Sequence, residues 1–248
     1  MKITVLGTNG WFDTDTGSTN CVLLQTSDYS VIMDAGFGIT KIKTRVDFSK
    51  PVYLFLTHLH LDHVIGLHAL DYFNFEQPLR VITPIGGTDD LKDLLRSPFS
   101  AAWDSHVYPI EMIDAKNLEK TNLPFKVEAL PLVHAVPDTG YRFEIDGKII
   151  AFVIDTAYCE NAVKLAKNAD LLITECGFYP GTVNTVSGHM TPETAAKLAS
   201  DSNAKQTVLI HFGANAFETI DKRSRAVDTG RKVYPGLIMG LDNMEFIL

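Results

Sequence analysis

Cysteine is scarce in this 248-residue chain, and its three residues, Cys21, Cys159 and Cys176, show no Cys-x-x-Cys spacing. An odd number without that spacing argues against both a disulfide framework and a cysteine-rich zinc site. Long apolar runs are also missing, because no stretch reaches the length that a membrane span needs. The apolar run at residues 1–7 is too short for a signal peptide and is expected to form the first strand. We therefore expect a cytoplasmic protein with no membrane partner.

Positive charge is in short supply as well, since 22 Lys and Arg stand against 30 Asp and Glu and give a formal charge of −8. Proteins that hold long nucleic acids do so through clustered Lys and Arg, so we expect no extended nucleic-acid surface. Two short basic patches, residues 41–45 and 222–232, are interpreted as solvated faces. A small anionic substrate remains compatible with this charge, because bound cations make a site locally positive.

No linker, low-complexity tract or internal repeat divides the chain, and 46% of its residues are hydrophobic. A chain of this length and composition can bury one large core or two packed sheets. Helical patterns at residues 161–169 and 192–200 alternate with short apolar runs, which indicates an α/β fold. We predict a single domain over residues 1–248.

The most informative motif is the run THLHLDH at residues 57–63, directly after the apolar residues 52–56. Imidazole and carboxylate groups are the usual ligands of catalytic zinc. If the apolar residues form a buried strand, its two-residue period places His58 and His60 on one side. The turn that follows then carries Asp62 and His63 to a neighbouring point. The motif therefore predicts two adjacent metal ions rather than one.

Three further apolar runs each deliver one residue that can bind a metal. They end at His134, at Asp155 and at His211. A lone histidine or aspartate at the end of a strand is more often a cap or a turn residue. The repetition of the pattern nevertheless favours ligands, and with the first motif these residues complete two metal sites.

His189 precedes an expected helix start, in which Thr191 is the N-cap and Pro192 the first helical residue. Because the two metal sites are already full, we interpret His189 as a catalytic acid or base. Glu175 ends another apolar run and is expected to orient this imidazole. The alternative for Glu175 is a solvent-facing carboxylate, which is the more common state of that residue type.

The order His58-x-His60-x-Asp62-His63, His134, Asp155 and His211 resembles the metallo-β-lactamase superfamily. The runs DAGFG at 34–38 and GYRF at 140–143, and the segment beginning at His189, resemble its ribonuclease Z branch, which includes the cyclic phosphodiesterase of the phosphonate pathway. The likeness covers essentially the full chain. It implies a four-layer αββα sandwich and two divalent metal ions. Zinc is the first choice, with manganese or iron as alternatives because nitrogen and oxygen ligands admit all three.

The resemblance also implies how the site residues divide their work. One ion is held by His58, His60 and His134, the other by Asp62, His63 and His211, with Asp155 bridging the two. The catalytic residues are then Asp62, which accepts or orients the proton of the attacking water, and the His189–Glu175 pair. That pair stabilises the phosphoryl oxygen or protonates the leaving alkoxide. Asp34 either holds a ligand histidine or caps a turn.

Ribonuclease Z enzymes carry an arm that grips transfer RNA, and this chain has no room for one between His134 and Asp155. A compact hairpin with an Asp-Gly turn at residues 146–147 is expected there instead. A small or cyclic phosphodiester is therefore the predicted substrate, and relatives that form dimers make a homodimer compatible with this assignment. The alternatives are a thioester or lactone hydrolase on the same scaffold, which typically lacks the His189–Glu175 pair, a ribonuclease Z-like nuclease, and a noncatalytic metal-binding sensor. No role is assigned to His68 and His106.

Overall fold

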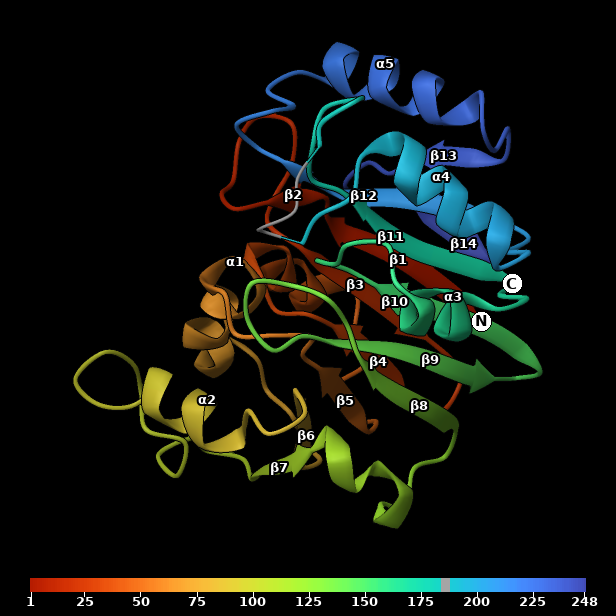
Figure 1. Ribbon diagram of the computed structural model, residues 1–248. Coiled ribbons are helices and arrows are strands. Elements are labelled where there is room, and N and C mark those ends of the chain that lie inside the picture. The colour runs from red at the N-terminus through yellow and green to blue at the C-terminus, as the bar shows by residue number, and fades with distance from the viewer. Residues whose placement is uncertain (184–187) are drawn as a thin grey trace.

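Two β-sheets form the centre of the protein in a computed structural model that describes residues 1–183 and 188–248 (Figure 1). Within these residues each sheet has seven strands. The first sheet has the strand order β14 (Glu245–Ile247), β1 (Lys2–Gly7), β3 (Cys21–Gln25), β4 (Ser30–Met33), β5 (Val52–Phe55), β6 (Leu79–Thr83) and β7 (Ile110–Asp114). The second has the order β13 (Leu237–Met239), β12 (Thr207–Gly213), β11 (Leu171–Cys176), β10 (Lys148–Val153), β9 (Thr139–Ile145) and β8 (Lys126–Pro131), with the short β2 (Asn9–Gly10) paired to β12.

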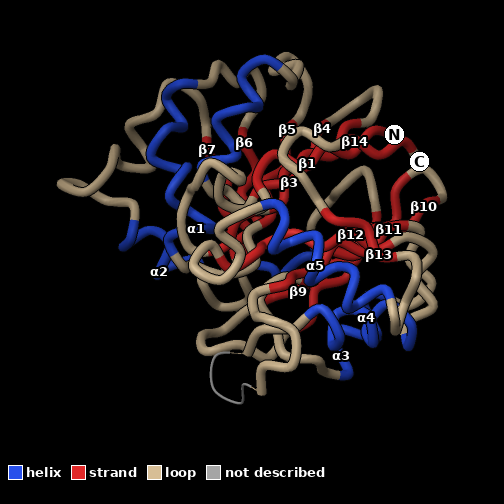
Figure 2. Tube along the Cα trace, turned by 90° about the horizontal axis from the view of Figure 1, so that it is seen from above, coloured by secondary structure: helices blue, strands red, loops and turns tan. Residues whose placement is uncertain are grey.

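Helices cover the outer face of each sheet, as the view from above shows (Figure 2). The first sheet is covered by the 3₁₀ helices η1 (Phe37–Thr44) and η2 (Ile65–Tyr72) with the short α1 (Leu61–Val64) and α2 (Thr88–Leu94). The second is covered by α3 (Glu160–Ala166), α4 (Pro192–Asp201) and α5 (Ile220–Arg231). A further 3₁₀ helix, η3 (Ala115–Lys120), packs its apolar residues into the layer between the sheets. None of the helices in the described ranges is both long and apolar enough to span a bilayer.

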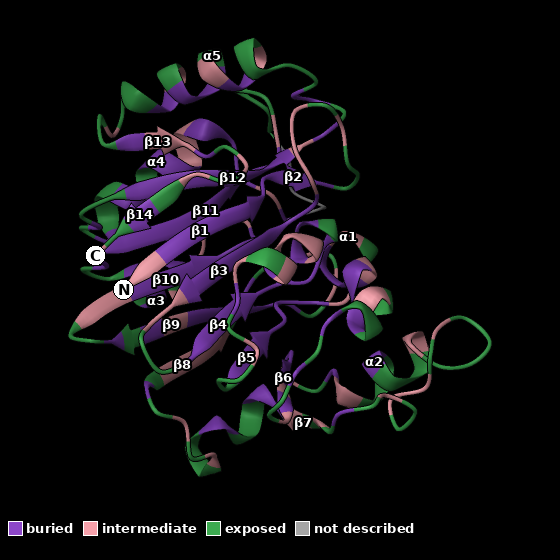
Figure 3. Cartoon of the chain, turned by 180° about the vertical axis from the view of Figure 1, so that it is seen from behind, coloured by how far each residue is buried: buried purple, intermediate pink, exposed green. Residues whose placement is uncertain are grey.

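Three apolar clusters hold these four layers together. Along β10, Ile150 and Phe152 belong to the cluster between the sheets, whereas Ala151 and Val153 belong to the cluster beneath α3, α4 and α5. This alternation follows from the two-residue period of a strand that is buried on both faces. The strands are accordingly buried throughout most of their length, and exposure is confined largely to helix faces and loops (Figure 3). The predicted αββα sandwich is confirmed.

The local predictions hold with small differences at the ends. Residues 1–7 contain the first strand, and Thr191 caps α4 through a capping box with Thr194. The expected helix at 161–169 ends earlier, at Ala166, because Lys167 has a non-helical ψ of 118° and Asn168 follows with a left-handed φ of 55°. The expected Asp-Gly turn joins β9 to β10, with φ of 52° at Asp146 and 72° at Gly147. Positive φ at both central residues defines the type I′ turn of a tight hairpin.

Candidate metal centre

The candidate site lies where strands of both sheets end. β10, β11 and β12 are parallel neighbours, so their carboxyl ends meet at one edge. Asp155 follows β10, while Glu175 and His211 lie near the ends of β11 and β12. His58 follows β5 of the first sheet and reaches the same point. The site therefore depends on the packing of the two sheets against each other.

Three polar residues at this edge have positive backbone φ angles, which residues other than glycine rarely adopt. Asp34, Asp155 and His211 have φ of 58°, 48° and 47°. The left-handed region costs roughly 1–3 kcal/mol for a residue other than glycine, although Asp and His tolerate it better than most. Such a turn redirects the side chain at the end of a strand, and here it contributes to bringing the three into one buried cluster. Local strain of this kind is concentrated at functional sites.

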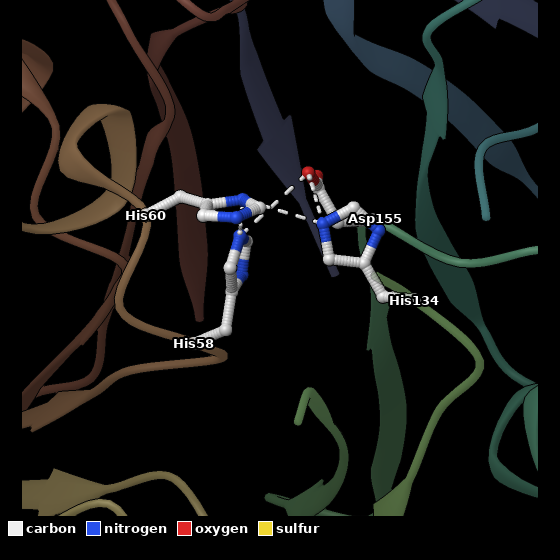
Figure 4. A group of neighbouring side chains, drawn as sticks. All are labelled: His58, His60, His134 and Asp155. Carbon is white, nitrogen blue, oxygen red and sulfur yellow. Dashed lines mark hydrogen bonds and ion pairs between the residues drawn. The ribbon is translucent and has the colours of Figure 1, made fainter. Parts of the chain in front are cut away.

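Three imidazoles form the first cluster. His58 Nε2 lies 2.9 Å from His60 Nδ1, and His134 Nε2 lies 3.3 Å from the same atom. The four side chains His58, His60, His134 and Asp155 point into one common space (Figure 4). A tetrahedral zinc ion with Zn–N bonds of about 2.1 Å has ligand atoms roughly 3.4 Å apart. The spacing of these ring nitrogens is close to that of a metal's ligand set.

A second cluster lies beside the first. His63 Nε2 and His211 Nε2 are 3.0 Å apart, and Asp62 Oδ2 lies 3.3 Å from His211 Nε2 and 3.5 Å from His63 Nε2. All three side chains are at least largely buried. Two imidazoles and a carboxylate within this distance offer a second set of ligands for a divalent ion.

Asp155 lies between the clusters and is almost completely buried. Its Oδ1 is 3.1 Å from His211 Nε2, and its Oδ2 is 3.8 Å from both His58 Nε2 and His134 Nε2. Burial raises the pKa of this carboxyl group, but the nearby His211 and His63 outweigh burial and hold the pKa well below its usual range. One oxygen thus faces each cluster, which is the arrangement that a bridging carboxylate needs.

The outward ring nitrogen of His63 is held by a buried carboxylate. Asp34 Oδ2 lies 2.8 Å from His63 Nδ1, while Asp34 Oδ1 accepts a hydrogen bond of 2.8 Å from the Thr57 amide. Asn20 Nδ2 donates to Asp34 Oδ2 at 2.8 Å and fixes the carboxylate further. Asp34 therefore orients an imidazole of the second cluster, as one of its two interpretations from the sequence had it, and also holds the amide at the start of the histidine motif.

The structure differs from the sequence predictions in two local features of the site. The turn expected at Asp62 and His63 is wound into one helical turn, α1, with His60 as its N-cap. His211 was expected to end its strand, but β12 continues to Gly213. A register irregularity beside Glu175 and Cys176 and the left-handed φ of His211 let the strand continue while the imidazole turns into the site.

Glu175 is fully buried and faces His189, so it is not a solvent-facing carboxylate. Both its oxygens lie 3.1 Å from His189 Nδ1, and they also accept hydrogen bonds from the amides of Thr156 (2.7 Å) and Gly177 (3.0 Å). Burial lowers the pKa of His189, but the charge and hydrogen bond of Glu175 outweigh it and raise the pKa to about 9. His189 Nδ1 is 3.9 Å from Asp155 Oδ2, so the imidazole borders the candidate metal centre.

Three residues of the centre were not singled out from the sequence. Gly10 packs against His211 so closely that a Cβ there would lie 2.4 Å from the ring. The Trp11 amide donates a hydrogen bond of 2.6 Å to Asp62 Oδ2. Asp138 is 3% exposed, lies 4.0 Å from His58 Nδ1, and accepts no hydrogen bond of ordinary length from the described part of the chain. Burial, followed by the charge of Asp155, raises the pKa of Asp138.

These three residues left almost no signal in the sequence. Gly10 and Trp11 reach the site through the pairing of β2 with β12, a contact between distant parts of the chain. Asp138 offered a weak signal, because it is a charged residue directly before β9.

The histidines without an assigned role lie outside both clusters. His68 is exposed, and its Nδ1 contacts the Ile65 carbonyl within η2. His106 Nδ1 pairs with Asp71 Oδ1 at 2.6 Å. The three cysteines are free, with Cys21 and Cys176 buried and Cys159 partly exposed.

The αββα sandwich and the two adjacent His/Asp clusters at its strand ends are together the features of a class of metal-dependent hydrolases. The profile described as the beta-lactamase superfamily domain matches residues 29–212. The chain belongs to this superfamily.

Individual relatives extend the likeness over nearly the whole chain. This chain is 27% identical to the probable metallo-hydrolase YhfI of Bacillus subtilis, and the alignment covers 93% of this chain and 95% of YhfI. The crystal structure of YhfI superposes with a TM-score of 0.81, at 24% identity and 99% coverage of both chains. Ribonuclease Z of Metallosphaera sedula is 26% identical over 95% of this chain and 94% of its own. A diphosphatase of the PhnP family has the same fold, with a TM-score of 0.75 at 15% identity, and 100% of this chain and 97% of that one are covered.

Proposed function

We propose that this metal-dependent hydrolase is a dinuclear phosphodiesterase that acts on a small or cyclic phosphodiester. The observation that carries the proposal is the buried Glu175–His189 pair beside the two ligand clusters. An alkoxide leaving phosphorus needs a proton, and the buried Glu175 carboxylate at Nδ1 favours the protonated imidazole by raising the pKa of His189. The names of the relatives, a ribonuclease and a diphosphatase, agree with chemistry at phosphorus.

The residues of the two clusters fit a pair of divalent ions. His58, His60 and His134 would hold one ion, and Asp62, His63 and His211 the other, while Asp155 offers one oxygen to each. When bound, such ions polarise a phosphoryl oxygen and lower the pKa of water to about 7. Zinc suits this set of imidazoles and carboxylates best, and manganese or iron are the alternatives.

The protein's own groups then divide the remaining work. Asp62, fixed by the Trp11 amide, orients the attacking water or accepts its proton at a carboxylate oxygen. Glu175 holds Nδ1 of His189, which leaves Nε2–H as the proton donor for the departing alkoxide. A positioned acid of this kind contributes about 10²- to 10⁴-fold in rate.

The surface favours a small substrate over a long RNA. The cations of α5 that reach the surface are paired with neighbouring carboxylates, as in Lys222–Glu218 (2.6 Å) and Arg225–Asp221 (2.9 Å). Lys41 is likewise paired with Asp242 at 2.6 Å. The hairpin between β9 and β10 turns within two residues, so it carries no arm. Among the connections that the structure describes in full, the longest irregular one is residues 95–109, and it has only one arginine and no lysine.

We also infer that residues 1–248 act as one unit, because each ligand cluster draws on both halves of the chain. The first cluster joins His58, which follows β5 of the first sheet, to His134, which follows β8 of the second. Neither sheet alone holds a complete set of ligands.

The proposal is tested by turnover of the zinc- and manganese-loaded protein on bis(p-nitrophenyl) phosphate, beside a thioester and a lactone. We expect hydrolysis of the phosphodiester alone. His189→Ala should keep its metal and lose about 10²-fold or more on a diester with an alkyl leaving group, but less on a p-nitrophenyl ester, which leaves without a proton. Turnover of the thioester or lactone with no phosphodiesterase activity would assign the site to carbonyl chemistry instead.

A further inference from the structure

The cavity above the metal centre has two kinds of wall. It measures about 550 Å³, within the range of small-molecule sites. Its ionisable lining residues all belong to the metal centre, and the rest are neutral: Gly10, Trp11, Leu61, Phe178, Gly177, Gly213 and Asn215. Among the described lining residues there is no lysine or arginine. A substrate that enters it therefore has its reacting group held by the centre and the remainder held by apolar and aromatic contacts.

Trp11 is the unusual residue of this wall. Its side chain is 66% exposed, and its φ of 79° is a left-handed angle that a bulky residue rarely adopts. The Trp11 amide bonds Asp62, but a glycine would supply that amide without strain. Neither the core nor the hydrogen bond explains an indole here. Strain combined with exposure at the entrance to a metal centre indicates that the side chain itself has a function.

The loop that carries Trp11 is rigidly anchored at its base. Asn9 Nδ2 donates to the Phe12 carbonyl at 3.1 Å, and Arg223, fully buried, donates to Asn9 Oδ1 at 2.5 Å and to Thr16 Oγ1 at 2.7 Å. The charge of Arg223 is thus buried chiefly against neutral oxygens of this loop, and it also lies over the Phe212 ring. An aromatic side chain held on such a base loses little conformational freedom when a ligand stacks on it.

From this wall we infer the substrate class: a phosphodiester that carries one flat, uncharged ring, such as a nucleobase or an aryl group, and no second phosphate. Trp11 is the specificity-determining residue, and it stacks on that ring while the phosphodiester lies on the metal centre. The inference rests on the proposed phosphodiesterase function. A cyclic phosphodiester of a plain sugar or polyol has no flat, uncharged ring for Trp11 to stack on. A substrate with a further phosphate would find no lysine or arginine among the described lining residues.

The test compares two cyclic phosphodiesters that share the reacting group, 2′,3′-cyclic AMP and glycerol 1,2-cyclic phosphate. Their selectivity is the ratio of the two kcat/KM values. We expect Trp11→Ala to lower this ratio about tenfold, mainly by raising KM for 2′,3′-cyclic AMP, because stacking on one base contributes about that factor to binding. Trp11→Phe should restore most of the ratio. Trp103→Ala, at the other tryptophan, which lies outside the cavity, is the matched control and should leave the ratio unchanged.

A binding measurement separates this inference from the proposed function. In Trp103→Phe, Trp11 is the one remaining tryptophan, and we expect cyclic AMP but not glycerol cyclic phosphate to quench its fluorescence. If the wild type hydrolyses both diesters and Trp11→Ala leaves the selectivity intact, or lowers both kcat/KM values equally, the inference is wrong and the proposed function stands. Quenching without any diester hydrolysis would overturn the proposed function while supporting the ring site. The absence of both quenching and hydrolysis would overturn the inference and the proposed function together.

Discussion

At the scale of single residues, the site depends on buried carboxylates and imidazoles that lie next to one another and stabilise each other's charge. His63 is fixed by Asp34, Asp155 is surrounded by imidazoles, and Glu175 serves His189. Buried carboxylates are costly unless they are paired or hydrogen-bonded; Asp34 and Glu175 accept hydrogen bonds from backbone amides, and Asp155 is paired with imidazoles. The proton held by His189 is the clearest consequence, because its pKa is set by Glu175 against the opposing effect of burial.

Replacing that carboxylate should move the pH profile in a known direction. A general acid works while it is protonated, so activity is lost as the pH rises through the pKa of His189. Glu175→Gln removes the negative charge that raises this pKa, so the alkaline limb of kcat should move to lower pH by about 1–3 units. The measurement is the pH profile of kcat on an alkyl-leaving phosphodiester at fixed metal loading, with Glu128→Gln, whose side chain lies at the surface of β8, as the control. An alkaline limb that stays in place would mean that another group supplies the proton.

At the scale of elements, the ends of strands decide where the candidate metal ligands lie. Local sequence predicted this well, because an apolar run followed by His or Asp identifies a strand end without knowledge of its neighbours. His134 and Asp155 emerge from the strands expected for them, β8 and β10. It did not predict that β2 pairs with β12, because that pairing joins distant segments and has no local period. Gly10 was missed for this reason, although it sets how closely the chain approaches His211.

That close approach gives a sharp test of the β2–β12 pairing. A Cβ on Gly10 would lie 2.4 Å from the His211 ring, a distance that requires the imidazole or the strand to move. We therefore expect Gly10→Ala to weaken metal binding at the second cluster by about 10- to 100-fold, as displaced or poorly supported ligands do. Metal titration monitored by atomic spectrometry measures this. Gly147→Ala is the control: a Cβ there meets nothing within 4 Å, the left-handed φ of 72° strains only the β9–β10 turn, and both ions should be retained. Unchanged affinity in Gly10→Ala would show that the ring has room to yield.

At the scale of the whole molecule, neither sheet alone supplies all the residues of the candidate metal centre, and the packing of the two sheets brings them together. The αββα layers could be predicted from alternating apolar runs and the resemblance, and the gathering of the His and Asp residues into two clusters from their order along the chain. The position of Asp138 behind His58 and of Trp11 over the cavity could not, because each depends on which segments the packed sheets bring together. The sequence likewise placed Glu175 only as one of two alternatives, and burial between β10 and β12 decided between them.

The measurement that most directly tests the central claim is the number of metal ions per chain, followed together with phosphodiester turnover. Metal-free protein is dialysed against increasing zinc, and bound metal and hydrolysis of bis(p-nitrophenyl) phosphate are measured on the same samples. The structure predicts two ions per wild-type chain and one in His134→Ala or His211→Ala, each of which removes a ligand from a different cluster. Full turnover should require both ions. Only one ion per wild-type chain at saturation, or two tightly bound ions in both variants, would contradict the dinuclear centre.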